Sequence, residues 1–118
     1  MFVARFPNWV ASVTFKSGAK AYFDGPKDLF TYYVNPKAYD AAAKRSNIVR
    51  VTVKGYYSLK PIDARKAYFV SGSDVAGPMG AELVAFERKS DAMGFRKDHH
   101  GKRVLRFTEI TPAVLKAL

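Results

Sequence analysis

The sequence predicts an α+β fold built from two small homologous strand-strand-helix-strand units packed together. Short β-branched and aromatic runs are separated by turn residues, which is typical of strands. Two other segments combine apolar residues at helical spacing with residues that favour the start of a helix. Both halves show the same order of elements, so we infer a weak internal repeat of about 50 residues. The expected units are residues 1–57 and 64–118, joined by a linker at 58–63.

The first unit is expected to open with a hairpin of strands at 8–15 and 20–25, because "KSGA" between them is turn-like. A helix should follow from Pro26, which suits a first helical turn, and the helix dipole favours Asp28 there. Asn35 precedes a proline and should end this helix. The segment "KAYDAAAKR" is expected to add a short turn of helix, and the β-branched segment "NIVRVTVKGYY" predicts the last strand.

The second unit is expected to place its helix over "DAMGFRKDHH", with Ser90 as the N-cap and Gly101 ending it. A final helix should begin with Thr111 as its N-cap and Pro112 in its first turn. Strands are expected at 64–73, 81–88 and 102–107.

Composition excludes several classes of protein. The chain has 118 residues, of which 48% are hydrophobic, enough for a packed core. No stretch approaches the roughly 18 apolar residues of a membrane helix, and "MFVARFPNWV" lacks the features of a signal peptide, so we expect the chain as given to be soluble. The absence of cysteine excludes disulfides, thiolate zinc sites and cysteine nucleophiles within this chain.

The net charge of +10 raises nucleic acid, anionic membrane or an acidic protein as partners. The basic residues are scattered, however, and the one dense run is "RKDHHGKR" at 96–103. No helix-turn-helix, zinc-finger or RNP-type motif accompanies the charge. We therefore expect a solvated basic surface and no nucleic-acid partner.

Enzymatic motifs are poor in this sequence, and we expect no enzyme. There is no G-x-S-x-G nucleophile elbow, and the acidic residues show no obvious acid/base pairing. His99 and His100 are adjacent, so on a helix they would point about 100° apart, unlike the i, i+4 pair of a metal face. At a helix C-terminus they are expected to be cationic surface residues.

Met79 lies in "SGSDVAGPMGAEL" (71–83), a stretch expected to form a loop. Its thioether is a soft ligand that suits Cu(I), and the Gly-Pro-x-Gly frame restricts the backbone while leaving the side chain room to point outward. The residues alone favour the alternative, that Met79 fills a gap at the end of the core, which methionine does well. Met93 falls in a helical pattern and is expected to serve packing.

Three segments carry a family resemblance: "YFDGPKDLFTYY", "VKGYYSLKPIDARKAYFV" and "SGSDVAGPMGAELVAFERKSDAMGFRKDHHGKRVLRF". Together they resemble the NosL family, the accessory proteins of nitrous oxide reductase, over nearly the whole chain. The resemblance implies a periplasmic, usually lipid-anchored Cu(I) metallochaperone that serves maturation of the reductase's copper centres in denitrification. It also implies two homologous strand-strand-helix-strand units, as in the alkylmercury lyase accessory fold.

The family pattern includes a Cys-Gly-Met motif near the mature N-terminus, whose cysteine is implied to bind Cu(I) together with the methionine of the Gly-Pro-Met-Gly loop. Met1 occupies the place of that motif's methionine and the cysteine is absent, so Met1 and Met79 become the candidate metal ligands. Either the chain is a fragment that starts just after Cys-Gly, which we favour, or it is a natural variant without the thiolate. Thioethers, with or without an imidazole, should hold Cu(I) weakly or not at all.

The resemblance implies nitrous oxide reductase, or another copper acceptor protein, and a copper donor protein as partners. Membrane contact is expected only through a lipid anchor missing from this chain. The main rival function is a basic module that binds an anionic partner, with Met79 structural. A third possibility is a copper-free scaffold that docks on a maturation partner through its aromatic residues.

Overall fold

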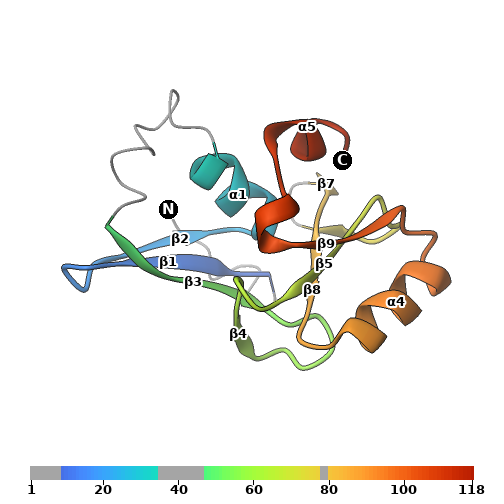
Figure 1. Ribbon diagram of the computed structural model, residues 1–118, viewed down its shortest axis with the longest axis horizontal. Helices are drawn as coiled ribbons and strands as arrows, with labels where there is room; N and C mark the ends of the chain where they lie inside the picture. Colours follow the sequence, from blue (N-terminus) through green and yellow to red (C-terminus); the bar gives the residue numbers. More distant parts are fainter. Residues whose placement is uncertain (1–8, 35–46, 78–79) are drawn as a thin grey trace.

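The computed structural model describes residues 9–34, 47–77 and 80–118, and within them two sheets repeat one strand arrangement (Figure 1). The first sheet has the order β2-β1-β3-β4 and the second the order β8-β5-β9, and their strand pairs are antiparallel. In each unit the first strand therefore lies between the second and the third, which confirms the α+β fold of two homologous units. The strands are β1 (Ala11–Phe15), β2 (Lys20–Phe23), β3 (Ile48–Lys54), β4 (Pro61–Asp63), β5 (Tyr68–Ser71), β8 (Val84–Phe86) and β9 (Arg103–Arg106), with a separate pair of β6 (Ala76–Gly77) and β7 (Gly80–Ala81).

One helix follows the second strand of each unit. Helix α1 (Pro26–Val34) follows β2 and buries Leu29 and Phe30. Helix α4 (Lys89–Asp98) follows β8, and a short helix η1 (Phe107–Glu109) and helix α5 (Pro112–Lys116) come after β9. In Figure 1, α1 and α5 lie on the same side of the first sheet, whereas α4 flanks the second sheet.

The first sheet is buried on one face. Val13, Val51 and Val53 point toward the core and are fully buried, whereas Tyr22 and Arg50 are exposed. Because successive residues of a strand point to opposite faces, this alternation is what a half-solvated antiparallel sheet requires.

The second sheet is buried on both faces. One row of side chains joins the main core, and the next row packs against the helix α4, which contributes Ala92 and Phe95. Strands covered on both faces read as continuous apolar runs, as in "YFVS" and "VAF". The first row is Phe69, Ala85 and Leu105, and the second is Val70, Val84 and Phe86.

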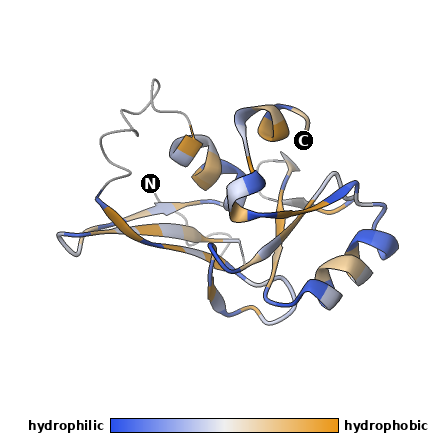
Figure 2. Cartoon of the chain, viewed as in Figure 1, coloured by the Kyte–Doolittle hydropathy of each residue, from blue (hydrophilic) through white to orange (hydrophobic). Residues whose placement is uncertain are grey.

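The main core is shared by the two units. Val13 and Phe30 of the first unit belong to the same cluster of buried residues as Phe69 and Leu105 of the second. The rings of Phe30 and Phe69 meet edge to face with their centroids 5.3 Å apart. Figure 2 shows the hydrophobic colour concentrated on the central strands, with hydrophilic ends on α4. The units are thus packed together around one core.

Several expected boundaries shift in the structure. The segment 58–63, expected as a linker, contributes β4, which pairs with β3 and extends the first sheet. The expected strand 81–88 is divided, because Glu82 and Leu83 lie between β7 and β8. The short helical turn expected over "KAYDAAAKR" lies outside the described residues. The unit boundaries themselves remain a prediction.

The ends of α4 correct two expectations. Arg88, not Ser90, is the N-cap, because the first helical bond already runs from the Ala92 N–H to the Arg88 carbonyl. The Arg88 side chain makes no capping bond. At the other end His100, not Gly101, takes the left-handed conformation, with φ 57°. The expectation for the last helix is confirmed, since the Thr111 hydroxyl accepts a bond from the Val114 N–H at 3.3 Å.

Candidate functional site

The Gly-Pro-Met-Gly segment is carried by a short hairpin. Ala76 pairs with Ala81 and Gly77 pairs with Gly80, so Pro78 and Met79 connect β6 to β7. The expectation that this whole stretch is loop is therefore wrong for the flanking residues. Gly80 has φ 91°, a left-handed conformation that glycine adopts readily, and this accounts for a glycine directly after the methionine.

Both candidate metal ligands, Met79 and Met1, lie outside the described residues. The structure does describe the residues that follow Met79 in the chain. Gly80 and Ala81 are exposed, whereas the next two residues, Glu82 and Leu83, are buried. The chain thus passes from solvent into the core immediately after the hairpin.

Glu82 is a buried carboxylate that joins this hairpin to the first unit. It is 5% exposed, and its Oε1 accepts hydrogen bonds from the Lys27 N–H at 2.5 Å and from its own neighbour Leu83 N–H at 2.9 Å. Lys27 lies in the first turn of α1, where backbone N–H groups lack helical partners and favour negative charge. A side chain of the second unit therefore caps a helix of the first.

Two glycines make room for Glu82. A Cβ added at Gly25 would overlap the Oε2 atom, and one added at Gly77 would lie 3.0 Å from the Glu82 Cγ. Glycine at these positions lets the backbone before α1 and the backbone of β6 approach the carboxylate from two sides. Gly25 of "FDGPKD" and Gly77 of "AGPMG" thus have a packing role that the sequence did not reveal.

Burial raises the pKa of Glu82 from 4.5 to about 7. Desolvation is the main cause, and it outweighs the opposing effects of the two N–H donors and of the Lys27 charge. The nearby Asp28 adds to the rise and has a raised pKa of its own, chiefly from desolvation. Glu82 was not among the predicted site residues, although a lone acidic residue ahead of the buried run "LVAF" was a signal that could have found it.

The start of the same connection is held by His99. Its Nδ1 lies 2.9 Å from the Asp74 Oδ1, and the Asp74 N–H donates to the His99 carbonyl at 2.9 Å. The imidazole stacks on Phe95 at 4.4 Å. His99 was expected to be a cationic surface residue at the end of a helix; it does lie at the C-cap of α4, and its bond with Asp74 is an addition.

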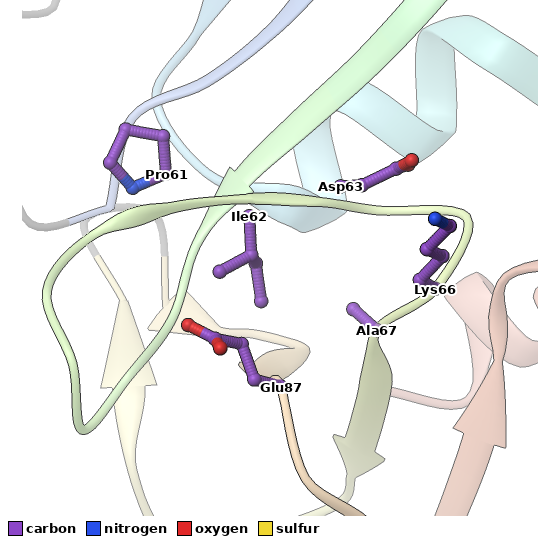
Figure 3. A pocket seen from close by; sticks show the side chains of 6 residues that line it. All are labelled: Pro61, Ile62, Asp63, Lys66, Ala67 and Glu87. Carbon is purple, nitrogen blue, oxygen red and sulfur yellow. The ribbon is translucent and has the colours of Figure 1, made fainter.

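Other parts of the described chain offer less for metal chemistry. Within residues 9–34, 47–77 and 80–118, no group of three or more histidine, cysteine or acidic residues could hold a metal ion. Figure 3 shows an open pocket between β4 and the end of β8 that presents two carboxylates and one ammonium group but no thioether. Its lining residues are Pro61, Ile62, Asp63, Lys66, Ala67 and Glu87. In the described part of the chain, no helix is long and apolar enough to cross a membrane.

A family model described as NosL matches residues 1–115 of the 118. The chain belongs to the NosL family. The resemblance seen in the sequence is therefore confirmed. The copper-binding lipoprotein NosL of Stutzerimonas stutzeri is 47% identical over 55 residues, which are 47% of this chain and 28% of that protein. The chain thus spans little more than a quarter of that relative's length in the alignment.

The solved structures include a NosL relative with the same fold. The crystal structure of the copper chaperone NosL from Shewanella denitrificans matches with a TM-score of 0.75 and 28% sequence identity. The match covers 88% of this chain and 79% of the other. The arrangement of two repeated units around one core is thus the arrangement of that NosL protein.

Proposed function

We propose that this NosL chain binds Cu(I) and transfers it to an acceptor protein, nitrous oxide reductase, during maturation of the acceptor's copper centres. The observation that carries the proposal is the likeness to a copper chaperone over most of both chains. The relatives are named for copper binding or as a chaperone and not for catalysis. The proposed function is therefore the transfer of Cu(I) between proteins, without a catalysed reaction.

Met79 is the proposed Cu(I) ligand, with Met1 as a second thioether. The support is chemical and local: thioether sulfur is a soft donor that suits Cu(I), and the residues after Met79 are exposed. An exposed site with few ligands allows an incoming ligand to reach the metal before the first one leaves. Without a thiolate, the proposed site holds copper weakly.

The proposal is tested by anaerobic competition for Cu(I) with a chromogenic chelator. Met79→Leu should weaken binding at least about tenfold, which corresponds to about 1.4 kcal/mol. Met93→Leu is the matched control, because it makes the same substitution at an exposed position on the helix α4 and not in the β6–β7 connection. Equal affinities of the Met79→Leu variant and the parent chain would overturn the assignment.

A second experiment tests the missing thiolate. Adding Cys-Gly before Met1 should tighten Cu(I) binding by more than about tenfold, because it supplies a charged soft donor. Adding Ser-Gly is the control, since it lengthens the chain equally without the sulfur. Transfer to copper-free nitrous oxide reductase, followed by the copper content of each protein after the two are separated, then tests the proposed acceptor. We propose a periplasmic, lipid-anchored protein, because one relative is a lipoprotein.

A second candidate function, binding of an anionic partner, is supported by the outer face of the first sheet. The registers place Lys20, Arg50 and Lys54 on the face opposite the core, where Lys20 and Arg50 are exposed. Such binding should weaken steeply as salt rises, whereas Cu(I) binding through thioethers should survive moderate salt. Titrating an acidic polymer and Cu(I) at two salt concentrations separates the two functions.

A further inference from the structure

We propose that Glu82 is a positioning residue for the methionine ligand: its carboxylate holds the base of the β6–β7 hairpin against the first turn of α1. The inference rests on the proposed function, because it concerns the same site. It assigns to a buried acidic residue a role in copper affinity that it performs without touching the metal.

The hairpin needs an anchor outside itself. Its two strands consist of Ala76–Gly77 and Gly80–Ala81, and an isolated two-stranded hairpin is marginally stable at best in water. Its exposed strand β7 contributes little apolar burial of its own. Something beyond the pairing of β6 with β7 must therefore hold these two strands in place.

Glu82 meets that need because it contacts both sides. It follows Ala81 directly, and its Cβ and Cγ pack under Gly77 of the opposite strand, as shown by the 3.2 and 3.0 Å left for an added Cβ. Its Oε1 meanwhile accepts from the Lys27 N–H, 55 residues away in the sequence. One side chain thus links β6, β7 and α1.

The other anchor of this connection lies farther from the methionine. Asp74 is five positions before Met79 in the sequence. It is bound to His99 at the end of the second unit's own helix. Glu82 is three positions after Met79 and contacts β6 itself. The bond between Asp74 and His99 fixes where the connection leaves the second unit, and Glu82 fixes where the hairpin lies against the first unit.

The Glu82 side chain is matched to its place in shape, whereas burial opposes its negative charge and is only partly offset by nearby groups. The N-terminal N–H groups of α1 favour an acceptor with negative charge, and Lys27 adds a positive charge nearby. A glutamine at position 82 would keep one oxygen acceptor with nearly the same shape, whereas an alanine would remove the acceptor and leave the Lys27 N–H without it. The two substitutions therefore separate the effect of the bond from that of the charge.

The experiment compares Glu82→Ala, Glu82→Gln and Glu87→Ala in the full chain. Glu87→Ala is the matched control, because it removes the same group at an exposed position five residues later. Two measurements are made at a temperature at which all variants are folded: Cu(I) affinity by chelator competition, and amide hydrogen exchange of Gly77, Gly80 and Ala81 in the metal-free protein. The methyl resonances of the three methionines report which of them responds to Cu(I).

We expect Glu82→Ala to speed exchange in the hairpin and to weaken Cu(I) binding about tenfold or more, the range found when groups that orient a metal ligand are removed. Glu82→Gln should restore most of the affinity, and Glu87→Ala should stay within about twofold of the parent chain. Should Glu82→Ala fail to fold, Glu82→Gln and Gly77→Ala, which pushes against the Glu82 side chain, supply the same comparison.

Two results would overturn the inference. Unchanged hairpin exchange in Glu82→Ala would show that the carboxylate does not hold the hairpin. Faster exchange with unchanged Cu(I) affinity would show that it holds the hairpin without positioning a ligand. In that second case, Met79→Leu separates the two proposals. Weaker Cu(I) binding by this variant leaves the proposed function standing, whereas unchanged Cu(I) binding overturns the proposed function as well.

Discussion

The two units differ most in the connection between their first and second strands. Residues 16–19 join β1 to β2, whereas residues 72–83 join β5 to β8 and contain the β6–β7 hairpin. Both connections link neighbouring antiparallel strands, a task for which a few residues suffice. The additional length in the second unit is thus not needed for the topology, and this is where the candidate metal ligand is carried.

The units also differ in burial. The first sheet has one solvated face, while the second is covered on both faces by the main core and by α4. The longer connection is therefore built on the more deeply buried sheet, and Glu82 fastens it to the first unit. A rigid platform beneath an exposed segment is the usual arrangement for a functional loop.

The largest expected effect comes from breaking the core that the two units share. Phe69→Ala should lower the free energy of unfolding by about 3–5 kcal/mol, because Phe69 is fully buried and meets Phe30 across the unit boundary. Thr52→Ala, on the opposite face of the first sheet, is the control and should change it by less than about 0.5 kcal/mol. Denaturant unfolding followed by fluorescence and circular dichroism measures both. Two separate transitions in the parent chain would contradict a shared core.

The next largest effect is the pH dependence of the free energy of unfolding that Glu82 causes. The folded-state pKa of about 7 lies above the value of 4.5 for the free side chain, so folding favours the protonated form. The stabilising contribution is thus complete below pH 4.5 and is lost as pH rises through about 7. Relative to Glu82→Gln, the parent chain should lose up to about 3 kcal/mol over this interval.

Unfolding free energies measured from pH 4.5 to 8 check this, with Glu87→Gln as the exposed control. The charged groups that act on Glu82 are Lys27 and Asp28, so the Asp28→Asn variant should shift the profile modestly downward in pH. A pH profile of Glu82→Gln that parallels that of the parent chain would assign the titration to another group.

Two glycines should respond to alanine with opposite signs. Gly25→Ala places a methyl group against the Glu82 carboxylate and should cost about 1–3 kcal/mol. Gly94→Ala lies within α4, where an added Cβ meets nothing within 4 Å, and should stabilise by up to about 1 kcal/mol. Thermal and denaturant unfolding of the pair measures the difference. Stabilisation by Gly25→Ala would show that the carboxylate is not held against α1.

Local signals predicted the repeated architecture well. Pro26 and Thr111 mark the starts of α1 and α5 as expected, because caps and first-turn prolines act through neighbouring backbone groups. The N-cap of α4 was predicted wrongly, because Ser90 had the right chemistry while the backbone had already entered the helix from Arg88. Strand β4 was missed because three residues with one proline carry almost no pattern by themselves.

The candidate site was predictable only in part. The soft chemistry of Met79 can be inferred from its residue type, but Glu82 acquires its role from Lys27 and Gly25, more than fifty positions earlier in the chain. No periodicity or spacing encodes such a contact, since it arises from how the two units pack. The bond between Asp74 and His99 escaped sequence reasoning because it joins positions 25 residues apart within the second unit, and no local pattern encodes that contact.

The smallest expected effect on stability comes from the bond between Asp74 and His99. The Asp74 and His99 side chains are 52% and 38% exposed, so their coupling should be only about 0.2–1 kcal/mol. A double-mutant cycle of Asp74→Ala and His99→Ala isolates it, because the stacking of His99 on Phe95 is lost equally in both variants that lack the imidazole. A coupling above about 2 kcal/mol would instead make this end of the connection as firmly anchored as the Glu82 end, and the difference between the two anchors would disappear.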